Sequence, residues 1–191
     1  MADTKISALP AITTVLDADE YIVSRTGTSN KISGLTLRTF VNNPYVYIRD
    51  EKAQGVEGGA FTNGAWRTRT LNTKVYDVDN IATLSSNQVT LTAGTYHFVG
   101  RFPASGVGRV QARLQNVTDA TTIALGSQGA YTLAGTSGAI IHACARFTIS
   151  GGKALELQMR SEATQGNGWA QGVAGNWGTE IYAEVEFWKI G

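Results

Sequence analysis

The sequence predicts an all-β domain, built as a sandwich or a barrel, and three observations lead to this fold class. Beyond residue 43, roughly eight to ten short runs alternate apolar and polar residues between turn signals. Glycine occurs 22 times and proline only 3 times, a mixture that suits short strands and turns. No segment past residue 43 has the apolar period of a helix. Many short strands with regular turns are typical of a sandwich or a barrel.

The central stretch, residues 87–102, predicts a β-hairpin with a short Ala-Gly turn. Val89 and Leu91 share one face of its first run, and Tyr96 and Phe98 share one face of its second run. Further strands are predicted at residues 66–71, 74–76, 109–115, 121–125, 139–149, 154–160 and 180–190. In the last strand, the predicted inward side chains are Ile181, Ala183, Val185 and Phe187, and the predicted outward ones are Tyr182, Glu184, Glu186 and Trp188.

The longest apolar run, residues 139–149, has largely apolar residues on both faces. Its second face carries Ile140, His142, Cys144 and Arg146. Such a strand is either central in a sandwich or part of a subunit contact. Cys144 is the single cysteine, which excludes an internal disulfide framework, and we expect a small buried thiol there rather than a nucleophile.

Composition limits the partners that the protein is expected to have. The 191 residues suffice for one domain with a real core and a small appendage. Charged residues make up 16% and the net charge is +1, so nucleic acid is not an expected partner. No apolar run approaches the ~20 residues of a membrane span, and the N-terminus lacks a signal-peptide pattern. We therefore expect synthesis in a cytoplasm and no membrane insertion.

Residues 1–43 differ in character from the rest of the chain. The run 19–25 and the return at 30–32 predict a small hairpin, and residues 35–41 predict one or two helical turns. A piece of this size buries too little surface to be stable alone, so we expect it to need a partner surface. The predicted division is an N-terminal module at residues 1–43, a linker, neck or first strand at residues 44–58, and a main domain at residues 59–191.

The N-terminal runs resemble the short attachment module of tailed-bacteriophage fibre proteins. The resemblance is carried by Lys5-Ile6-Ser7-Ala8-Leu9-Pro10, Asp19-Glu20-Tyr21-Ile22-Val23, Asn30-Lys31-Ile32 and Leu35-Thr36-Leu37. It implies docking on another virion structural protein. The candidate attachment residues are Ile6, Leu9, Tyr21, Ile22, Val23, Ile32, Leu35 and Leu37.

The rest of the chain resembles a jelly-roll head found at the C-termini of phage fibre and structural proteins. The phrases that carry this resemblance lie at residues 59–73, 84–88, 93–96, 112–119 and 172–178, and the match spans about residues 49–191. The head is similar in architecture to the trimeric complement and tumour-necrosis-factor heads. The resemblance implies a jelly-roll β-sandwich and a homotrimer whose last strands lie near the three-fold axis.

The sequence itself gives weaker support for a subunit interface. Two arginines in the run 109–115 and two glutamates in the last strand form complementary arrays. They either pair between subunits or stay solvated, because exposed ion pairs contribute only about 0–1 kcal/mol. Tyr182, Trp188 and Ile190 argue more strongly, since a lone domain has little reason to expose them together. The candidate interface residues are Arg109, Arg113, His142, Tyr182, Glu184, Glu186 and Trp188.

No catalytic, metal or cofactor site is predicted. His97 and His142 are the only histidines, and neither lies in a nucleophile context. His142 and Cys144 share a strand face but lack further ligands nearby, so a packed interface histidine is favoured over a metal site. Residues 77–80 place acidic oxygens together without the rest of a Ca²⁺ loop, which favours an ordinary turn. The glutamate pair of the last strand superficially suits glycoside cleavage, but its apolar neighbours favour an interface.

The loop at residues 161–178 is the favoured binding site, because it combines aromatic rings with amide groups that suit sugars. The candidate ligand-binding residues are Asn167, Trp169, Gln171 and Asn176. Trp177 is expected to plug the end of the sandwich instead. Residues 102–108 form a second candidate loop.

The predicted function is that of a non-enzymatic virion fibre or adhesin. Its N-terminus docks on other virion proteins and its trimeric head contacts a host cell-surface receptor, with a glycan as the expected class. Trimerisation raises a weak single-site affinity through effective concentration. The alternatives are a purely structural head-decoration or tail-adaptor protein, a depolymerase and a free bacterial lectin.

Overall fold

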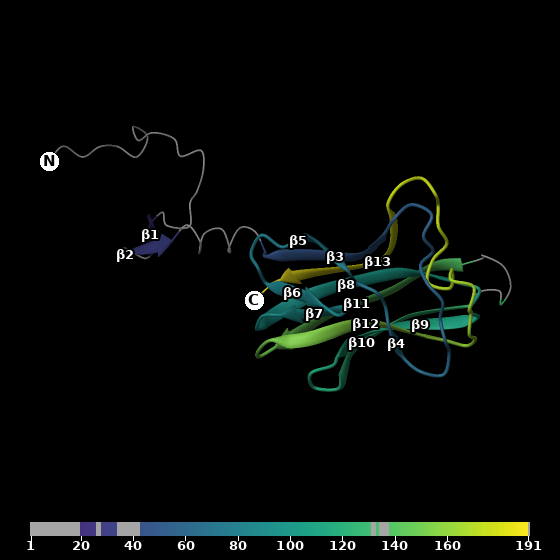
Figure 1. The fold of residues 1–191 in the computed structure, drawn as a ribbon. Helices are drawn as coiled ribbons and strands as arrows, with labels where there is room; N and C mark the ends of the chain where they lie inside the picture. Colours follow the sequence, from purple (N-terminus) through teal and green to yellow (C-terminus); the bar gives the residue numbers. More distant parts are fainter. Residues whose placement is uncertain (1–19, 26–27, 34–42, 131–132, 134–137, 191) are drawn as a thin grey trace. The chain divides into compact units, whose positions relative to one another are not determined.

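The computed structural model describes residues 20–25, 28–33, 43–130, 133 and 138–190 (Figure 1). The chain divides into two compact units, Met1–Asn43 and Pro44–Gly191. The run at residues 5–10 and the predicted helical turns at residues 35–41 lie outside the described residues.

The N-terminal unit contains the hairpin that the sequence predicts. Strands β1 (Glu20–Arg25) and β2 (Thr28–Ser33) pair antiparallel. Lys31 Nζ lies 2.6 Å from a carboxylate oxygen of Glu20, with both side chains largely exposed. An exposed ion pair adds little, and two strands alone are marginally stable in water.

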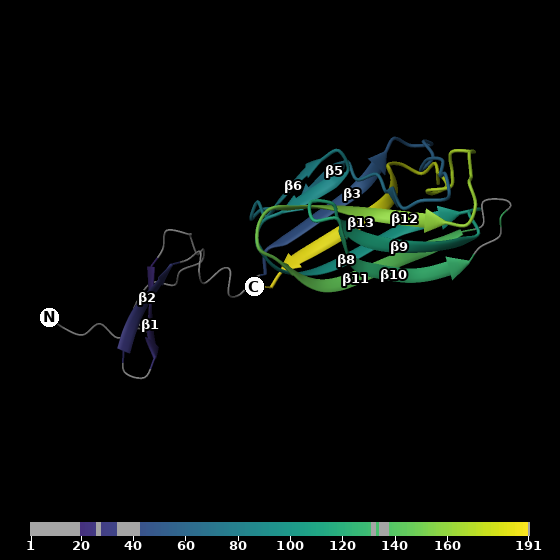
Figure 2. The same ribbon diagram turned by 90° about the horizontal axis from the view of Figure 1, so that it is seen from below.

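The second unit is a two-layer antiparallel sandwich, which confirms the predicted fold class (Figures 1 and 2). One sheet has five strands in the order β11 (Gly138–Ile149), β8 (Gly94–Ser105), β13 (Glu180–Lys189), β3 (Tyr45–Lys52) and β5 (Thr73–Tyr76). The other has six, with β10 (Thr121–Ala130), β9 (Arg109–Asn116), β12 (Lys153–Ser161), β7 (Gln88–Leu91) and β6 (Ala82–Ser85) in line and β4 (Arg67–Thr68) beside β12. The described residues form no helix.

The core fills the space between the two sheets. Because side chains alternate along each strand, one half of every central strand points inward. The five-stranded sheet contributes the aromatic part of the core, and the six-stranded sheet contributes mainly aliphatic side chains. The large buried residues include Tyr96, Phe98, Phe102, Ile141 and Phe187 from the first sheet and Leu91, Leu114, Leu155, Leu157 and Met159 from the second.

The edge strands β10 and β11 of the two sheets meet along one side of the sandwich. The hydroxyl of Ser127 on β10 donates to the carbonyl oxygen of His142 on β11 at 3.2 Å and accepts from its N–H at 3.3 Å. At Gly126, a Cβ atom would lie only 2.3 Å from the same carbonyl oxygen. This close approach covers two edges that would otherwise be open for pairing.

The two strands within residues 87–102 do not pair with each other, so the predicted hairpin is wrong. β7 pairs with β6 and β12 in the six-stranded sheet, whereas β8 pairs with β11 and β13 in the five-stranded sheet. The predicted faces are correct, because the inward residues of both runs contact the same core. Alternation reports which face is buried and carries no information on the partner strand. The chain therefore crosses between the layers at Thr92 and Ala93.

The last strand departs from the predicted alternation at its start. The pairing of β13 with β3 shifts register between Ile181 and Glu184. As a result Ile181 is 43% exposed and Tyr182 only 4% exposed, the reverse of the prediction. From Ala183 onward the predicted faces are correct, with Val185 buried.

Three further expectations are corrected. The predicted strand at residues 66–71 is reduced to β4, and β6 forms where no strand is predicted. Cys144 is exposed rather than buried, because β11 alternates strictly and this residue falls on the outward face of the five-stranded sheet. The sulfur therefore lies on a surface.

Candidate functional site

Two long loops, residues 53–66 and 162–179, lie at the end of the sandwich opposite the start of β3 and the end of β13 (Figure 2). We call this the apical end. The two loops are joined by backbone hydrogen bonds. Phe61 and Gln165 bond each other's N–H and C=O groups at 2.9 and 2.8 Å, and Gly58 N–H donates to the carbonyl oxygen of Gly172 at 2.9 Å. The loops therefore form one connected apical structure.

Glu180, the first residue of β13, fixes the turn of the second loop. Its buried carboxylate accepts backbone N–H groups from Gly55 at 3.1 Å, Gly175 at 2.9 Å and Asn176 at 2.8 Å. These backbone donors hold the pKa of the Glu180 carboxyl below its ordinary value. At neutral pH the carboxylate thus ties both loops to the sheet.

Two cationic side chains donate hydrogen bonds to backbone carbonyl oxygens of the apical loops. Lys52 Nζ donates to the carbonyl oxygens of Glu57 at 3.2 Å and Gly58 at 2.6 Å. Arg69 is 1% exposed, and its Nη2 donates to the carbonyl oxygen of Gln171 at 2.8 Å. Its guanidinium lies 4.7 Å from the ring centre of Phe102, and its Nε has no hydrogen-bond partner among the described residues. Burial lowers the pKa of Arg69 to about 9.

The predicted ligand residues have different positions in this apical structure. Asn167 is exposed and Trp169 is half-buried. The Gln171 amide donates to the carbonyl oxygen of Ala60 at 2.7 Å, so this side chain joins the two loops. Asn176 is exposed and adopts a positive φ of 63°. Whether these side chains bind a ligand stays a prediction.

The prediction that Trp177 plugs the end of the sandwich is wrong. This side chain is 96% exposed. The turn around Gly175 and Asn176 is anchored by the Glu180 carboxylate, and the next residue projects away from the sheet. The second predicted loop, residues 102–108, is largely the end of β8, and its Val107 is buried. Among the described residues of the two apical loops, the largely exposed aromatic side chain is therefore Trp177.

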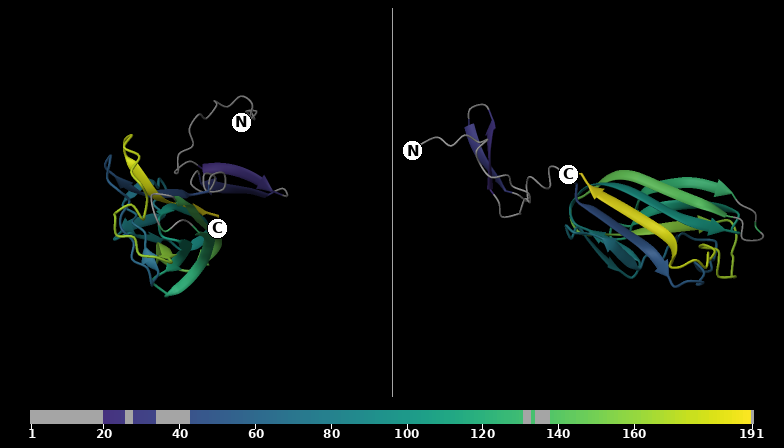
Figure 3. Two further views of the ribbon diagram at one scale, coloured as in Figure 1. Left: turned by 90° about the vertical axis from the view of Figure 1, so that its right-hand side faces the viewer. Right: turned by 90° about the horizontal axis from the view of Figure 1, so that it is seen from above.

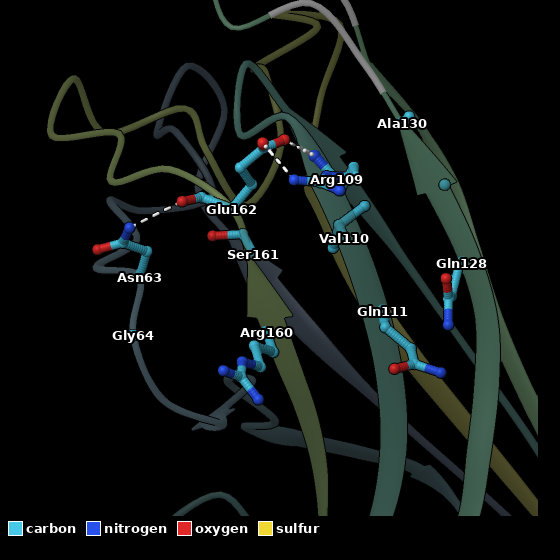
Figure 4. A pocket seen from close by; sticks show the side chains of 11 residues that line it. Asn63, Gly64, Arg109, Val110, Gln111, Gln128, Ala130, Arg160, Ser161 and Glu162 are labelled. Carbon is cyan, nitrogen blue, oxygen red and sulfur yellow. Dashed lines mark hydrogen bonds and ion pairs between the residues drawn. The ribbon is translucent and has the colours of Figure 1, made fainter.

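A polar groove of about 740 Å³ lies on the outer face of the six-stranded sheet, near its apical end (Figure 4). Its walls come from β9, β10 and β12 and from the first apical loop. The lining residues with long polar side chains are Asn63, Arg109, Gln111, Gln128, Arg160 and Glu162. This groove is not recognisable from the sequence, because it depends on the register between three strands.

The outward face of the five-stranded sheet carries a row of rings at its basal end. Figure 3 shows this end of the sheet, where β3 begins and β13 ends. Tyr76, Tyr45, Trp188 and His97 follow one another across β5, β3, β13 and β8. The ring centres of successive members lie 5.6, 5.1 and 5.5 Å apart. Tyr76 is 45% exposed, so part of this aromatic row faces solvent in the single chain.

Charged groups occupy the middle of the same face. Arg101 Nε lies 2.6 Å from Glu184, and its Nη1 lies 3.3 Å from Glu186. Tyr47 donates a hydrogen bond to Glu184, and Tyr45 donates one to Glu186 at 2.8 Å. The hydrogen bond from Arg101 holds the pKa of Glu184 below its ordinary value, whereas burial and the hydrogen bond to Glu186 raise the pKa of Tyr45. Both glutamates therefore have partners within one chain, and Arg101 compensates one of their two negative charges.

The apical part of this face is apolar. A depression of about 420 Å³ is lined in part by Pro103, Ile140, Val173 and Ile181. Ile140 is 50%, Val173 40% and Ile181 43% exposed. Soluble monomers rarely gather exposed apolar side chains on one face in this way.

The predicted interface residues divide between the two layers. His142, Glu184, Glu186 and Trp188 share the outward face of the five-stranded sheet. Tyr182 is buried, and its hydroxyl donates to the carbonyl oxygen of Val56 at 2.7 Å. The remaining two predicted interface residues, Arg109 and Arg113, lie on β9 of the six-stranded sheet. Each has a partner in the same chain, Glu162 for Arg109 and Gln158 for Arg113.

The predicted attachment residues can be placed only in part. Tyr21, Ile22 and Val23 lie on β1 and Ile32 lies on β2. Ile6, Leu9, Leu35 and Leu37 lie outside the described residues.

In the part of the chain that the structure describes, no group of three or more His, Cys, Asp or Glu side chains is arranged to hold a metal ion. This part also contains no helix with the length and hydrophobicity needed to cross a membrane. The acidic side chain of Asp77 instead caps its own turn by accepting the N–H groups of Ile81 and Ala82.

Comparison with known proteins identifies the architecture. No protein-family model and no curated protein sequence matches this chain. Among solved structures, the chain is similar to the globular domain of zebrafish complement 1qA protein, with 16% identity, coverage of 78% of this chain and 98% of that chain, and a TM-score of 0.49. It is also similar to murine APRIL at pH 8.0, with 8% identity, coverage of 78% and 100%, and a TM-score of 0.53. At such low identity the likeness to APRIL shows the fold alone, a jelly-roll sandwich.

Proposed function

We propose that this chain is a non-enzymatic structural protein of a bacteriophage virion, a homotrimeric adhesin that attaches to a host-surface glycan. The observation that carries the proposal is the outward face of the five-stranded sheet. It combines a row of rings at the basal end, charged groups paired within the chain in the middle, and exposed apolar side chains at the apical end. The occupant that we assign to this face is two further copies of the same chain.

The distribution of charge on this face suits self-association. Arg101 pairs with both Glu184 and Glu186 within each copy, so only one of the two negative charges is left uncompensated when like faces meet. The apolar side chains of Ile140 and Ile181 lose their solvent exposure when copies pack, which is the main favourable term in association. The jelly-roll fold and the resemblance to trimeric heads support three copies rather than two.

The apical end is the part of the head that we assign to host contact. The two loops are joined by backbone hydrogen bonds and fixed by Glu180, so little ordering entropy is lost when a ligand binds. Trp177 presents an almost fully exposed ring on this framework. An indole ring of this kind offers a flat apolar surface for the C–H face of a sugar. The N-terminal unit is assigned to docking on another virion protein, as its resemblance implies.

Replacing Trp177 with alanine is expected to reduce binding of the protein to host cells by about tenfold or more, because an aromatic anchor typically dominates a small contact. The measurement is binding of fluorescently labelled protein to host cells. Leu125→Ala, which removes a 61% exposed apolar side chain far from the apical loops, serves as the matched control. Wild-type protein that fails to bind any host cell would favour a purely structural decoration or adaptor protein. Equal binding by both variants would contradict the assignment to Trp177.

A further inference from the structure

The floor of the apical groove is a single row of long polar side chains across three strands. In the pairing register, Gln128 on β10 lies opposite Gln111 on β9, and Gln111 lies opposite Arg160 on β12. Neighbouring strands are about 4.8 Å apart, so the row extends over about 10 Å. Figure 4 shows these three side chains on neighbouring strands of the same sheet face. A saccharide of one or two rings matches this span.

Arg160 is the cation of the groove that has no internal partner. Its guanidinium is exposed and makes no hydrogen bond or ion pair with another residue that the structure describes. Arg109, in contrast, is neutralised by Glu162, whose carboxylate accepts from Nη2 at 2.8 Å and from the backbone N–H at 3.0 Å. The side chains that line the groove therefore carry a net charge of +1, and the unpaired positive charge is that of Arg160. A ligand with one negative charge suits it better than a dianion such as a phosphate monoester.

The amide side chains beside Arg160 supply the groups that bind hydroxyls. Gln111 Nε2 reaches the carbonyl oxygen of Gly126 only at 3.4 Å, and Gln128 makes no side-chain hydrogen bond within the described part of the chain. Each amide offers donors and an acceptor, and vicinal hydroxyls of a sugar match that combination. Val110 also lines the groove but is only 3% exposed, so it offers little apolar surface to a hydrophobic side chain. A polar ligand fits the groove better than a peptide.

We propose that this groove binds a carboxylated saccharide. The guanidinium of Arg160 holds the carboxylate through two parallel N–H bonds, and the amides of Gln111 and Gln128 bind ring hydroxyls. The inference rests on the proposed function only for the source of the saccharide, a host surface. The binding itself is a property of one sheet of each chain, because β9, β10 and β12 supply the whole row.

The test is calorimetric titration of the full chain with an oligogalacturonate. Two other probes accompany it. The methyl-esterified oligogalacturonate keeps the rings and removes the charge, and an oligosaccharide of κ-carrageenan carries sulfate groups and no carboxylate. We expect the ester to bind at least about tenfold more weakly than the acid, and binding of the acid to weaken as salt is raised. Equal affinity for acid and ester overturns the proposal. Tighter binding of a sulfate group than of a carboxylate also overturns it.

Arg160→Gln is expected to weaken binding of the oligogalacturonate by about tenfold or more, and Arg160→Lys to weaken it less, since lysine keeps the charge without the planar fork. Lys153→Gln, at the other end of the same strand, removes one positive charge and should bind like wild type. Because Arg160 is exposed, unchanged thermal melting separates lost binding from lost folding. Unchanged affinity of Arg160→Gln contradicts the assignment. If the protein binds host cells but not oligogalacturonate, this inference is wrong and the proposed function stands. If it binds oligogalacturonate but no host cells, the proposed function is wrong and this inference stands.

Discussion

Replacing Phe98 with alanine is expected to lower the free energy of unfolding by about 4 kcal/mol. The ring is completely buried and lies 5.1 Å from the ring centre of Phe187 on the neighbouring strand. The ring packs closely on the backbone of its own strand, because a Cβ atom at Gly100 would lie only 2.6 Å from it. The loss therefore combines the transfer of the ring with the cavity that it leaves.

The measurement is denaturant unfolding of wild type and Phe98→Ala at one fixed protein concentration, since self-association adds to apparent stability. Val75→Ala, on the edge strand β5, is the control, because Val75 is 44% exposed and should change the unfolding free energy by less than about 0.5 kcal/mol. If Phe98→Ala and Val75→Ala unfold alike, the ring does not lie in the core described above.

Arg69→Met is expected to lower the free energy of unfolding by about 3 kcal/mol at pH 7, although methionine fills much of the space. The substitution leaves the carbonyl oxygen of Gln171 without its donor. It also removes a cation that stabilises the charged form of Asp50, a carboxylate only 1% exposed. The apical loops therefore lose an anchor, and Asp50 loses part of its compensation.

The pH dependence of this variant follows from Asp50. Burial already raises the pKa of Asp50 in the folded chain, while Lys52 and Arg69 oppose the rise. Without Arg69 the folded-state pKa rises further above its unfolded value, so the destabilisation by Asp50 grows as pH rises from the unfolded pKa to the folded pKa. We expect Arg69→Met to lose less stability at pH 5 than at pH 8, and the double variant Asp50→Asn with Arg69→Met to lose this difference. Denaturant unfolding at both pH values checks this, and a variant as stable as wild type at pH 8 would contradict it.

Face assignments could be predicted from the sequence where the alternation is regular. Residues 139–149 and 109–115 have the predicted inward and outward sides, because both strands continue without a bulge over those residues. Tyr182 could not be placed, since the register shift before Glu184 depends on the pairing with β3. The partner strands of β7 and β8 could not be predicted either, because pairing is a long-range property that a local period does not encode.

The candidate sites were predictable to a smaller extent. The apical loop of residues 162–179 was recognisable from its glycine, amide and tryptophan content, but the exposure of Trp177 depends on Glu180 binding backbone groups on two loops. Gln111 and Arg160 both fall on outward positions of predicted strands. Only the register between β9 and β12 shows that they are neighbours. Outward arginines and glutamines at matching positions of two strands are the signal that would have suggested the groove.

The central claim is that three copies meet through the outward face of the five-stranded sheet, and the molar mass of the purified full chain in solution tests it most directly. Light scattering on protein separated by size exclusion is expected to give three times the 20.3 kDa of one chain, independent of loading concentration. A stable species with the mass of a single chain, at every concentration measured, would contradict the claim.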